Sequence, residues 1–185
     1  MSSKNYFEEV SRDWDVMSNE FFGEAPRSAI YSQIDWENVQ IMADIGCGSG
    51  YLTEGVINKD VKIIAVDQSP DMLSVMRDKF GNDKVDYRVG NSDDLPISSN
   101  VVDVVMANMY VHHVEEPKLA ISEMFRILKP GGSLVFCDLD KHDHYWLVEE
   151  QHDRWMGFER SDVRQRHLHR LAYRLPRCTS KNHCK

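Results

Sequence analysis

Three alternating glycines, followed further along the chain by an acidic residue, offer the clearest chemistry in this sequence. Gly46, Gly48 and Gly50 follow one apolar run, and Asp67 closes the next. Glycine reaches positive φ angles and has no Cβ atom, so a glycine-rich backbone can turn sharply and lie close to a bound molecule. The Asp67 carboxylate offers acceptor oxygens that suit a pair of ribose hydroxyls. The pattern therefore predicts a site for a cofactor that contains a nucleoside.

The residues around the glycines help to distinguish between a dinucleotide and a cationic cofactor. Glycines followed about 20 residues later by an acidic residue also suit a dinucleotide-binding fold, so an NAD(P)-dependent oxidoreductase is one alternative. The turn, however, reads D-x-G-x-G-x-G, with the carboxylate of Asp44 at its start. A negative charge is an unfavourable neighbour for a pyrophosphate. The turn therefore favours a cationic cofactor.

Five blocks in this order resemble the class I S-adenosylmethionine-dependent methyltransferases, in particular the small-molecule type found in ubiquinone and menaquinone biosynthesis. They read D-I-G-C-G-S-G at 44–50, V-D-Q-S-P-D-M-L at 66–73, G-N-S-D-D-L-P at 90–96, H-H-V-E-E-P at 112–117 and R-I-L-K-P-G-G at 126–132. The resemblance implies an enzyme that binds S-adenosylmethionine, methylates a small-molecule acceptor and releases S-adenosylhomocysteine. A non-catalytic protein that holds the cofactor is a further alternative.

The resemblance also implies cofactor contacts at the ends of several strands. The glycine turn would hold the methionine portion, Asp67 the ribose, the residues near 72 and 91 the adenine, and the activated methyl group would emerge at Asn108, Met109 and Tyr110. The expected set is Asp44, Gly46, Cys47, Gly48, Gly50, Asp67, Gln68, Ser69, Met72, Asn91, Ser92, Asn108 and Met109. Asn91 departs from the family, which more often has Asp there, although its amide can both donate and accept. The alternative for 91–94 is a solvated turn.

Methyl transfer from a sulfonium requires mainly that donor and acceptor are aligned and that water is excluded. A general base is optional in such a reaction. His112 and His113 are the candidates, since histidine titrates near neutral pH and follows the fourth expected strand. The alternative is that this pair only shapes the turn after the strand.

A second group of polar residues follows the fifth apolar run. It consists of Asp138, Asp140, His142, Asp143, His144, His152 and Asp153. Imidazole and carboxylate groups can bind a metal ion, but these residues lack an established ligand spacing. A solvated loop beside the acceptor pocket is favoured, and no metal is expected.

The elements that would position these residues alternate between strands and helices, which predicts an α/β fold with a Rossmann-like, doubly wound and mainly parallel sheet and helices on both faces. Apolar runs predict strands at 41–45, 62–66, 85–89, 102–107 and 133–137. Helices are expected at 52–58, 70–80 and 117–128, the last stopped by Gly131 and Gly132. Apolar residues within 6–22 indicate an amphipathic segment, so about the first 35 residues form either a lid over the cofactor or a helix packed on the sheet edge.

Composition fits one enzyme domain at 1–165. The chain has 185 residues and a formal net charge of −8, which disfavours nucleic acid as a partner and favours a small acceptor. The sequence shows no apolar signal region and no run long enough to span a membrane, so a cytoplasmic protein without membrane contact is expected. Its four cysteines are scattered and predict no disulfide framework. The sequence leaves open whether the protein forms a homodimer.

The tail at 166–185 differs from the rest of the chain because it contains no acidic residue. It falls outside the family resemblance, and a shift in reading frame is one explanation. Without the antiparallel C-terminal strands of relatives, the fifth strand would expose its edge. We therefore expect incomplete C-terminal strands and a tail that is irregular or pairs with another subunit.

Overall fold

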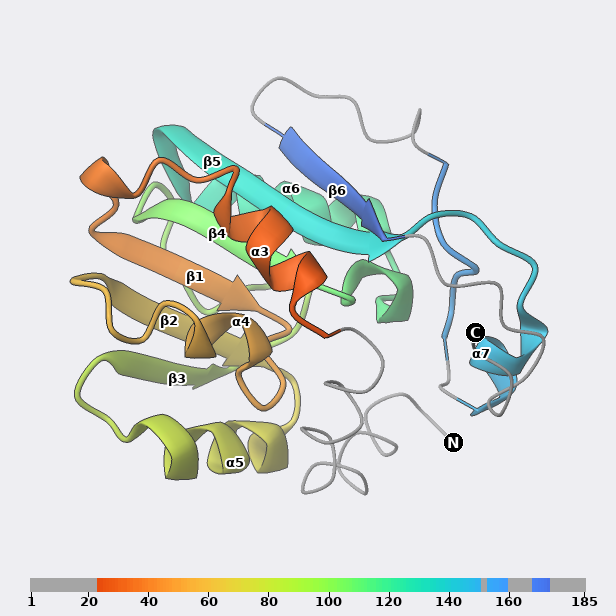
Figure 1. The fold of residues 1–185 in the computed structure, drawn as a ribbon, viewed down its shortest axis with the longest axis horizontal. Helices are drawn as coiled ribbons and strands as arrows, with labels where there is room; N and C mark the ends of the chain where they lie inside the picture. The colour runs from red at the N-terminus through yellow and green to blue at the C-terminus, as the bar shows by residue number, and fades with distance from the viewer. Residues whose placement is uncertain (1–22, 151–152, 160–167, 174–185) are drawn as a thin grey trace.

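The fold is built on one parallel sheet that crosses the molecule (Figure 1). The computed structural model describes residues 23–150, 153–159 and 168–173. Within these residues the strand order is β3-β2-β1-β4-β5-β6. The strands are β1 Ile41–Ile45, β2 Lys62–Asp67, β3 Val85–Val89, β4 Val102–Asn108, β5 Leu128–Leu139 and β6 Leu168–Tyr173. This arrangement confirms the predicted α/β, Rossmann-like and doubly wound class.

The central strands are buried on both faces, as their continuous apolar runs predict. In β1 every residue after Ile41 is buried, and β2 is buried from Ile63 to Val66. Met42 is in register with Ile63 on one side and with Val104 on the other, so β1 joins the two halves of the sheet.

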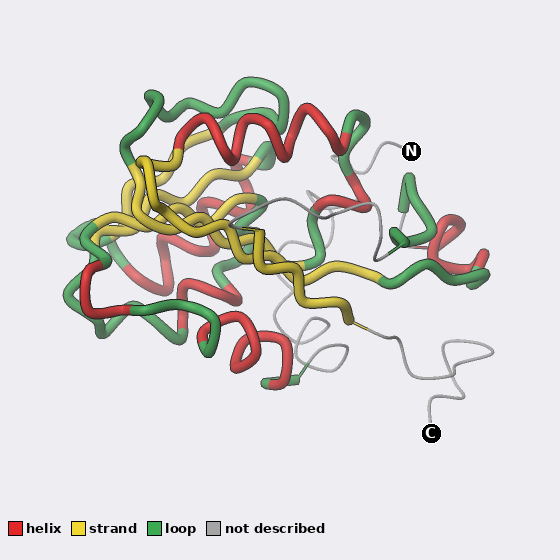
Figure 2. Tube along the Cα trace, turned by 90° about the horizontal axis from the view of Figure 1, so that it is seen from above, coloured by secondary structure: helices red, strands yellow, loops and turns green. Residues whose placement is uncertain are grey.

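Helices cover both faces of this sheet, as Figure 2 shows from above. The described helices are α3 Ala25–Tyr31, α4 Tyr51–Glu54, α5 Pro70–Phe80, α6 Pro117–Ile127 and α7 Tyr145–Glu150, with short 3-10 helices η1 Trp36–Asn38 and η2 Val111–His113. One core cluster takes residues from α3, α4 and α5, among them Ile30, Leu52 and Met76. The other takes Ala120 and Met124 from α6. The sheet thus separates two apolar layers.

Two helix ends differ from the prediction. The expected helix at 52–58 is the shorter α4, which ends at Glu54. Gly55 is its C-cap, and the Gly55 amide donates a hydrogen bond to the Thr53 carbonyl. The helix expected to run to 128 ends at Ile127, before Gly131 and Gly132 are reached. Leu128 is extended and pairs with Val102, so pairing with β4 starts β5 earlier than the expected 133. Between Val102 and Val104 the register shifts, which accommodates the residues added at this end.

The expectation of an irregular tail is wrong at Leu168–Tyr173. These residues form β6, which pairs in parallel with β5 from Leu134 with Leu168 to Leu139 with Tyr173. Unpaired amides and carbonyls of an edge strand favour the addition of another strand, and the chain's own tail fills this position. The strand counts against a shifted reading frame, which sequencing of the gene would test. The rest of the tail lies outside the described residues.

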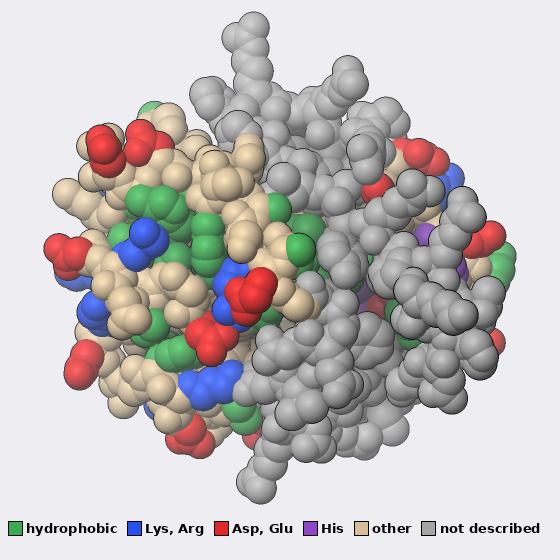
Figure 3. Space-filling view, viewed as in Figure 1, with side chains coloured by type: hydrophobic (Ala, Val, Ile, Leu, Met, Phe, Trp, Pro, Cys, Tyr) green, Lys and Arg blue, Asp and Glu red, His purple; other side chains and the backbone are tan. Residues whose placement is uncertain are grey.

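Two other features concern the molecule as a whole. Among the described residues, no helix combines the length and apolarity needed to cross a membrane. On the face drawn in Figure 3, acidic and basic side chains of the described residues are interspersed. The amphipathic segment at 6–22 lies outside the described residues.

Candidate active site

A cavity of about 460 Å³ lies beyond the carboxyl ends of the central strands. It occupies the position where the strand order reverses between β1 and β4, the usual ligand site of a doubly wound sheet. The expected site residues that line it are Asp44, Gly46, Cys47, Gly48, Asp67, Gln68, Met72, Asn91, Ser92, Asn108, Met109 and His113. The structure thus brings most of the expected set to one cavity. Gly50, Ser69 and His112 do not line it.

The glycine turn after β1 has the backbone conformation that its sequence predicts. Gly46, Gly48 and Gly50 have φ angles of 66°, 52° and 96°. The amides of Gly46 and Cys47 both donate to the carbonyl of Val66, at 2.9 and 3.1 Å, which holds the turn against the end of β2. A Cβ atom at Gly46 would stand 2.1 Å from Cδ2 of the Tyr110 ring. Tyr110 therefore requires glycine at this position.

Gly50 and Ser69 act on helices and not on the cavity. Gly50 is the left-handed N-cap of α4, and a Cβ atom there would stand 2.5 Å from the Phe80 ring. The buried hydroxyl of Ser69 accepts a hydrogen bond from the Met72 amide at 3.3 Å and caps α5. Both residues set the direction in which a helix leaves the site.

Asp67 ties the turns after β1 and β2 together. Its Oδ2 accepts a hydrogen bond from the Gly48 amide and its Oδ1 one from the Ser69 amide, each at 2.9 Å. Burial raises the pKa of Asp67, and these backbone amides partly offset that effect. Each carboxylate oxygen can accept more than one hydrogen bond, so Asp67 can bind the turns and a ligand together.

Asp44 places a second carboxyl, fully buried, beside the cavity. It is 1% exposed, and its Oδ2 accepts a hydrogen bond from the Thr53 hydroxyl at 2.8 Å. Burial raises the pKa of Asp44 to about 7, against the effect of the Thr53 bond. A cation in the cavity would favour the ionised form of this carboxyl.

The end of β4 contributes a strained backbone and a buried acceptor. Met109 is left-handed with φ 51°, and its amide donates to the Cys137 carbonyl at 2.8 Å. The Oδ1 atom of Asn108 is buried and accepts no hydrogen bond from the described residues. Asn108 and Met109 both line the cavity, so this acceptor lies at a ligand site.

The two neighbouring histidines lie in different surroundings. His112 is 2% exposed and its Nδ1 lies 2.7 Å from Oδ1 of Asp138, away from the cavity. Burial lowers the pKa of His112, but Asp138 and Asp153 outweigh burial and leave the pKa raised. His113 lines the cavity, and its Nδ1 lies 3.6 Å from Oδ1 of Asp153. Of the two candidates for a base, the structure brings His113 to the site.

A segment distant in sequence completes the wall of the cavity. The amides of Arg154 and Trp155 both donate to the His112 carbonyl, at 3.0 and 3.1 Å. The Trp155 indole donates to the Val114 carbonyl at 2.9 Å. These bonds bring Arg154 to the cavity.

His142 and His144, which belong to the polar loop after β5, stack on each other with ring centroids 5.3 Å apart.

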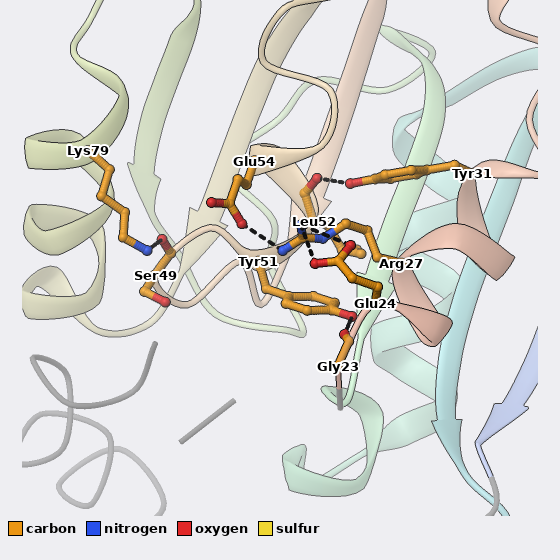
Figure 4. Close-up of polar contacts among 9 residues, drawn as sticks. All are labelled: Gly23, Glu24, Arg27, Tyr31, Ser49, Tyr51, Leu52, Glu54 and Lys79. Carbon is orange, nitrogen blue, oxygen red and sulfur yellow. Dashed lines mark hydrogen bonds and ion pairs between the residues drawn. The ribbon is translucent and has the colours of Figure 1, made fainter. Parts of the chain in front are cut away.

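The described end of the N-terminal region is fixed beside the glycine turn (Figure 4). The Arg27 guanidinium lies 2.7 Å from Glu54 and 3.3 Å from Glu24, and 4.4 Å above the Tyr51 ring. The Tyr51 hydroxyl donates to the Gly23 carbonyl at 2.6 Å, and Tyr51 lines the cavity. The segment before Gly23 therefore joins the described structure at the cavity wall. The lid expected at 1–35 falls mostly outside the described residues.

Sequence reasoning missed several residues of the cavity wall. Tyr51 and Arg154 are two of them. Tyr51 directly follows the predicted site residue Gly50, so its position in sequence could have indicated it. Tyr110, which was expected at the end of the fourth strand, also lines the cavity. Arg154 gave no local signal, because backbone bonds to the turn after β4 bring it to the cavity.

Comparisons with known proteins agree with this fold. A family model described as a methyltransferase domain matches residues 43–136. An uncharacterised methyltransferase of Schizosaccharomyces pombe is 40% identical over 114 residues, which cover 61% of this chain and 41% of the relative. Demethylmenaquinone methyltransferase of Clavibacter sepedonicus is 31% identical over 96 residues, which cover 51% of this chain and 39% of the relative. A chain in the complex of the Haloferax volcanii Trm112 methyltransferase activator with a methyltransferase superposes with a TM-score of 0.74 at 24% identity, covering 84% of this chain and 71% of that chain.

The matched family region extends from β1 into β5 and contains the glycine turn, Asp67 and the end of β4. The chain belongs to the class I S-adenosylmethionine-dependent methyltransferase family. It spans about two fifths of the length of the curated relatives it matches. The structural similarity at 24% identity bears on the fold alone.

Proposed function

We propose that this protein binds S-adenosylmethionine and transfers its methyl group to a small-molecule acceptor, releasing S-adenosylhomocysteine. The observation that carries the proposal is the cavity at the reversal of strand order, where the family's glycine turn and Asp67 meet. When bound, the cofactor supplies a methyl group on a positively charged sulfur. The chain's own residues then have to bind, orient and shield the two reactants.

The residues present fit this cofactor in charge and in shape. Asp44 is a buried carboxyl and Asp67 a half-buried one beside the cavity, and a cation offsets the cost of ionising them. Gly46 and Gly48 leave the turn without side chains on the cavity. We infer that the turn holds the methionine portion and Asp67 the ribose. Gln68, Met72, Asn91 and Ser92 would surround the adenosine, and the acceptor oxygen of Asn108 would receive a polar hydrogen of the cofactor.

The acceptor would lie beside the turn after β4. Met109, His113 and Arg154 line the cavity and come from the end of β4, from that turn and from the segment bound to it. His113 can take a proton from the acceptor as the new bond to carbon forms, and the walls from the turn after β4 keep water out. The buried His112 holds the turn through Asp138 and so positions His113.

We expect the two histidine variants to fail in different ways. His113→Ala should lower turnover by about 100-fold with little change in cofactor affinity, because a general base contributes on that order. His112→Ala should instead lower the free energy of unfolding by about 2–3 kcal/mol, because it removes a buried hydrogen bond to Asp138, which then keeps only the amides of Val111 and Leu139. Single-turnover rates and urea unfolding of both variants measure the two effects. Equal turnover of His113→Ala and wild type would remove the base from the proposal.

Cofactor affinity should rise with pH. The Asp44 carboxyl, with a pKa of about 7, is mostly protonated below that pH and ionised above it. Only the ionised form attracts a cation, so the affinity should increase about tenfold from pH 6 to pH 8 and then level off. Calorimetric titration at several pH values tests this. Asp44→Asn keeps the shape of the side chain without the charge, so it should bind more weakly and lose this part of the pH dependence. The same slope in that variant would assign the effect to another group.

Two experiments separate the proposal from its alternatives. Calorimetry with S-adenosylmethionine and with NAD(P) distinguishes a methyltransferase from an oxidoreductase, since binding of the dinucleotide alone would favour the latter. Incubation with labelled cofactor and a metabolite extract, followed by mass identification of the methylated product, then identifies the acceptor. A protein that binds the cofactor and labels no compound in extracts from its own source would fit the non-catalytic alternative.

A further inference from the structure

Three side chains beside the cavity point ligand atoms at a common position. Nε2 of His112 and Nδ1 of His113 each lie 3.6 Å from Oδ1 of Asp153. Each of the three residues offers one nitrogen or oxygen atom as a ligand, and these three atoms lie within 4.8 Å of one another. The histidines come from η2, after β4, whereas Asp153 follows α7. The fold has therefore brought distant segments together around this point.

These separations approach those of a metal centre. Bonds of about 2.0–2.1 Å to a tetrahedral ion place neighbouring ligand atoms roughly 3.3–3.4 Å apart. The two separations of 3.6 Å are slightly longer than this and too long for direct hydrogen bonds. Small side-chain movements would bring the three atoms onto one ion.

A carboxylate behind His112 fixes the imidazole in the orientation that metal binding requires. Nδ1 of His112 lies 2.7 Å from Oδ1 of Asp138, so its Nε2 is the atom that faces Asp153. Asp138 is itself held, because its Oδ2 accepts the Val111 amide at 2.7 Å. A histidine ligand commonly has such a carboxylate on its other ring nitrogen, which sets its tautomer and orientation.

The buried carboxylate of Asp153 would also be stabilised by a positively charged partner. Its side chain is 2% exposed, and its Oδ2 accepts no hydrogen bond from the described residues. A carboxylate buried in this way is costly unless it is paired or coordinates a metal. A divalent ion would compensate the charges of Asp153 and the neighbouring Asp138.

We propose that His112, His113 and Asp153 form a binding site for a divalent transition-metal ion of the Zn²⁺ type. Two imidazoles and one carboxylate suit such an ion, whereas Mg²⁺ and Ca²⁺ prefer oxygen ligands alone. The site departs from the sequence-based expectation of no metal and uses Asp153 with two residues outside the polar loop. Three protein ligands leave a coordination position for water or a ligand atom.

The ion would tie the segment that starts at Asp153 to the turn after β4. Arg154 and Trp155 already bind the His112 carbonyl through their amides, so the metal would reinforce an existing contact. Because His113 lines the cavity, the ion would lie beside the acceptor end of the site.

Metal titration of the full chain without a histidine tag tests the site directly. Protein freed of metal by a chelator is titrated with Co²⁺, whose visible absorption reports coordination, and Zn²⁺ is then added as a competitor. We expect saturation at about one ion per chain and displacement by Zn²⁺. Asp153→Asn should weaken Co²⁺ binding by at least about 100-fold, because it removes the charge of a ligand, and loss of an outer-shell partner alone costs about 10–100-fold. The double variant His142→Ala/His144→Ala removes a nearby histidine pair and should bind as wild type does.

The proposal is overturned if wild-type protein shows no saturable binding at millimolar Co²⁺, or if Asp153→Asn binds as tightly as wild type. X-ray absorption of the wild-type Zn²⁺ complex provides a test that does not depend on folded variants. Two imidazoles with oxygen ligands would support the site, and a shell without two imidazoles would contradict it. These measurements do not involve cofactor or methyl transfer, so they can fail while the proposed function stands, and the reverse also holds.

Discussion

Gly46→Ala is expected to lower the affinity for S-adenosylmethionine by at least about 100-fold. The added Cβ atom would lie 2.1 Å from the Tyr110 ring, at a residue whose φ is 66°. Relief requires movement of the ring or of the glycine turn, and both line the cavity. A left-handed conformation costs about 1–2 kcal/mol for a residue with a side chain. The rest of the expected loss of affinity comes from displacement of the turn, which would move away from Val66 and from the cofactor. Calorimetric titration measures the affinity.

Gly81→Ala is a matched control for this variant. Gly81 has nearly the same φ, 68°, but a Cβ atom there would meet nothing within 4 Å. With ψ −162° it lies in a region that is essentially reserved for glycine, so the variant should lose about 1–3 kcal/mol of stability from backbone strain and bind the cofactor normally. If Gly46→Ala also binds normally, the contact with Tyr110 does not shape the cofactor site.

Asp67→Ala should weaken cofactor binding by at least about tenfold, since it would remove the proposed charge-assisted contact to the ribose, and such contacts contribute about 1.5–3 kcal/mol. The structure adds an effect on stability. Asp67 also accepts the amides of Gly48 and Ser69, so the variant should unfold at lower urea concentration than wild type. Calorimetry and urea unfolding on the same preparation separate the two losses.

Asp86→Ala provides the corresponding control on the surface. Asp86 forms an ion pair with Arg88 at 2.6 Å, and its side chain is 55% exposed. Exposed pairs contribute about 0–1 kcal/mol, so this variant should change neither affinity nor stability much. Unchanged cofactor affinity in the folded Asp67→Ala protein would remove Asp67 from the ribose site.

The strands and helices that were predicted most closely carry their signals locally. The helix expected at 70–80 is α5 with the same bounds, where Ser69 caps the start, Pro70 occupies the first turn and Gly81 follows the end. The bounds of β1 and β3 also agree with their apolar runs. The start of β5 could not be read in this way. Leu128 belongs to a helical apolar pattern, and its pairing with Val102 decides its conformation.

In the candidate site, too, sequence predicts the residues with local signals and not those that distant contacts position. Motifs gathered at strand ends placed Asp67, Asn91 and Met109 at one cavity, because parallel strands end at the same edge of the sheet. Sequence could not separate His112 from His113. Adjacent residues in η2 face different surroundings, and the partner that distinguishes them, Asp138, comes from the end of β5. Arg154 reaches the cavity through equally distant contacts.

The strand order also determines when this cavity can exist during synthesis. Strands β1, β2 and β3 pair with one another as residues 41–89 emerge, and these contacts span short stretches of chain. The other edge of β1 has to wait for β4, when Met42 to Asp44 pair with Val104 to Met106. Such long-range parallel pairing forms late, and it leaves a strand edge open to other chains until then. A nascent chain that ends before β4 therefore displays the glycine turn and Asp67 without the opposite wall, so cofactor cannot stabilise the protein until more than half of it has been made.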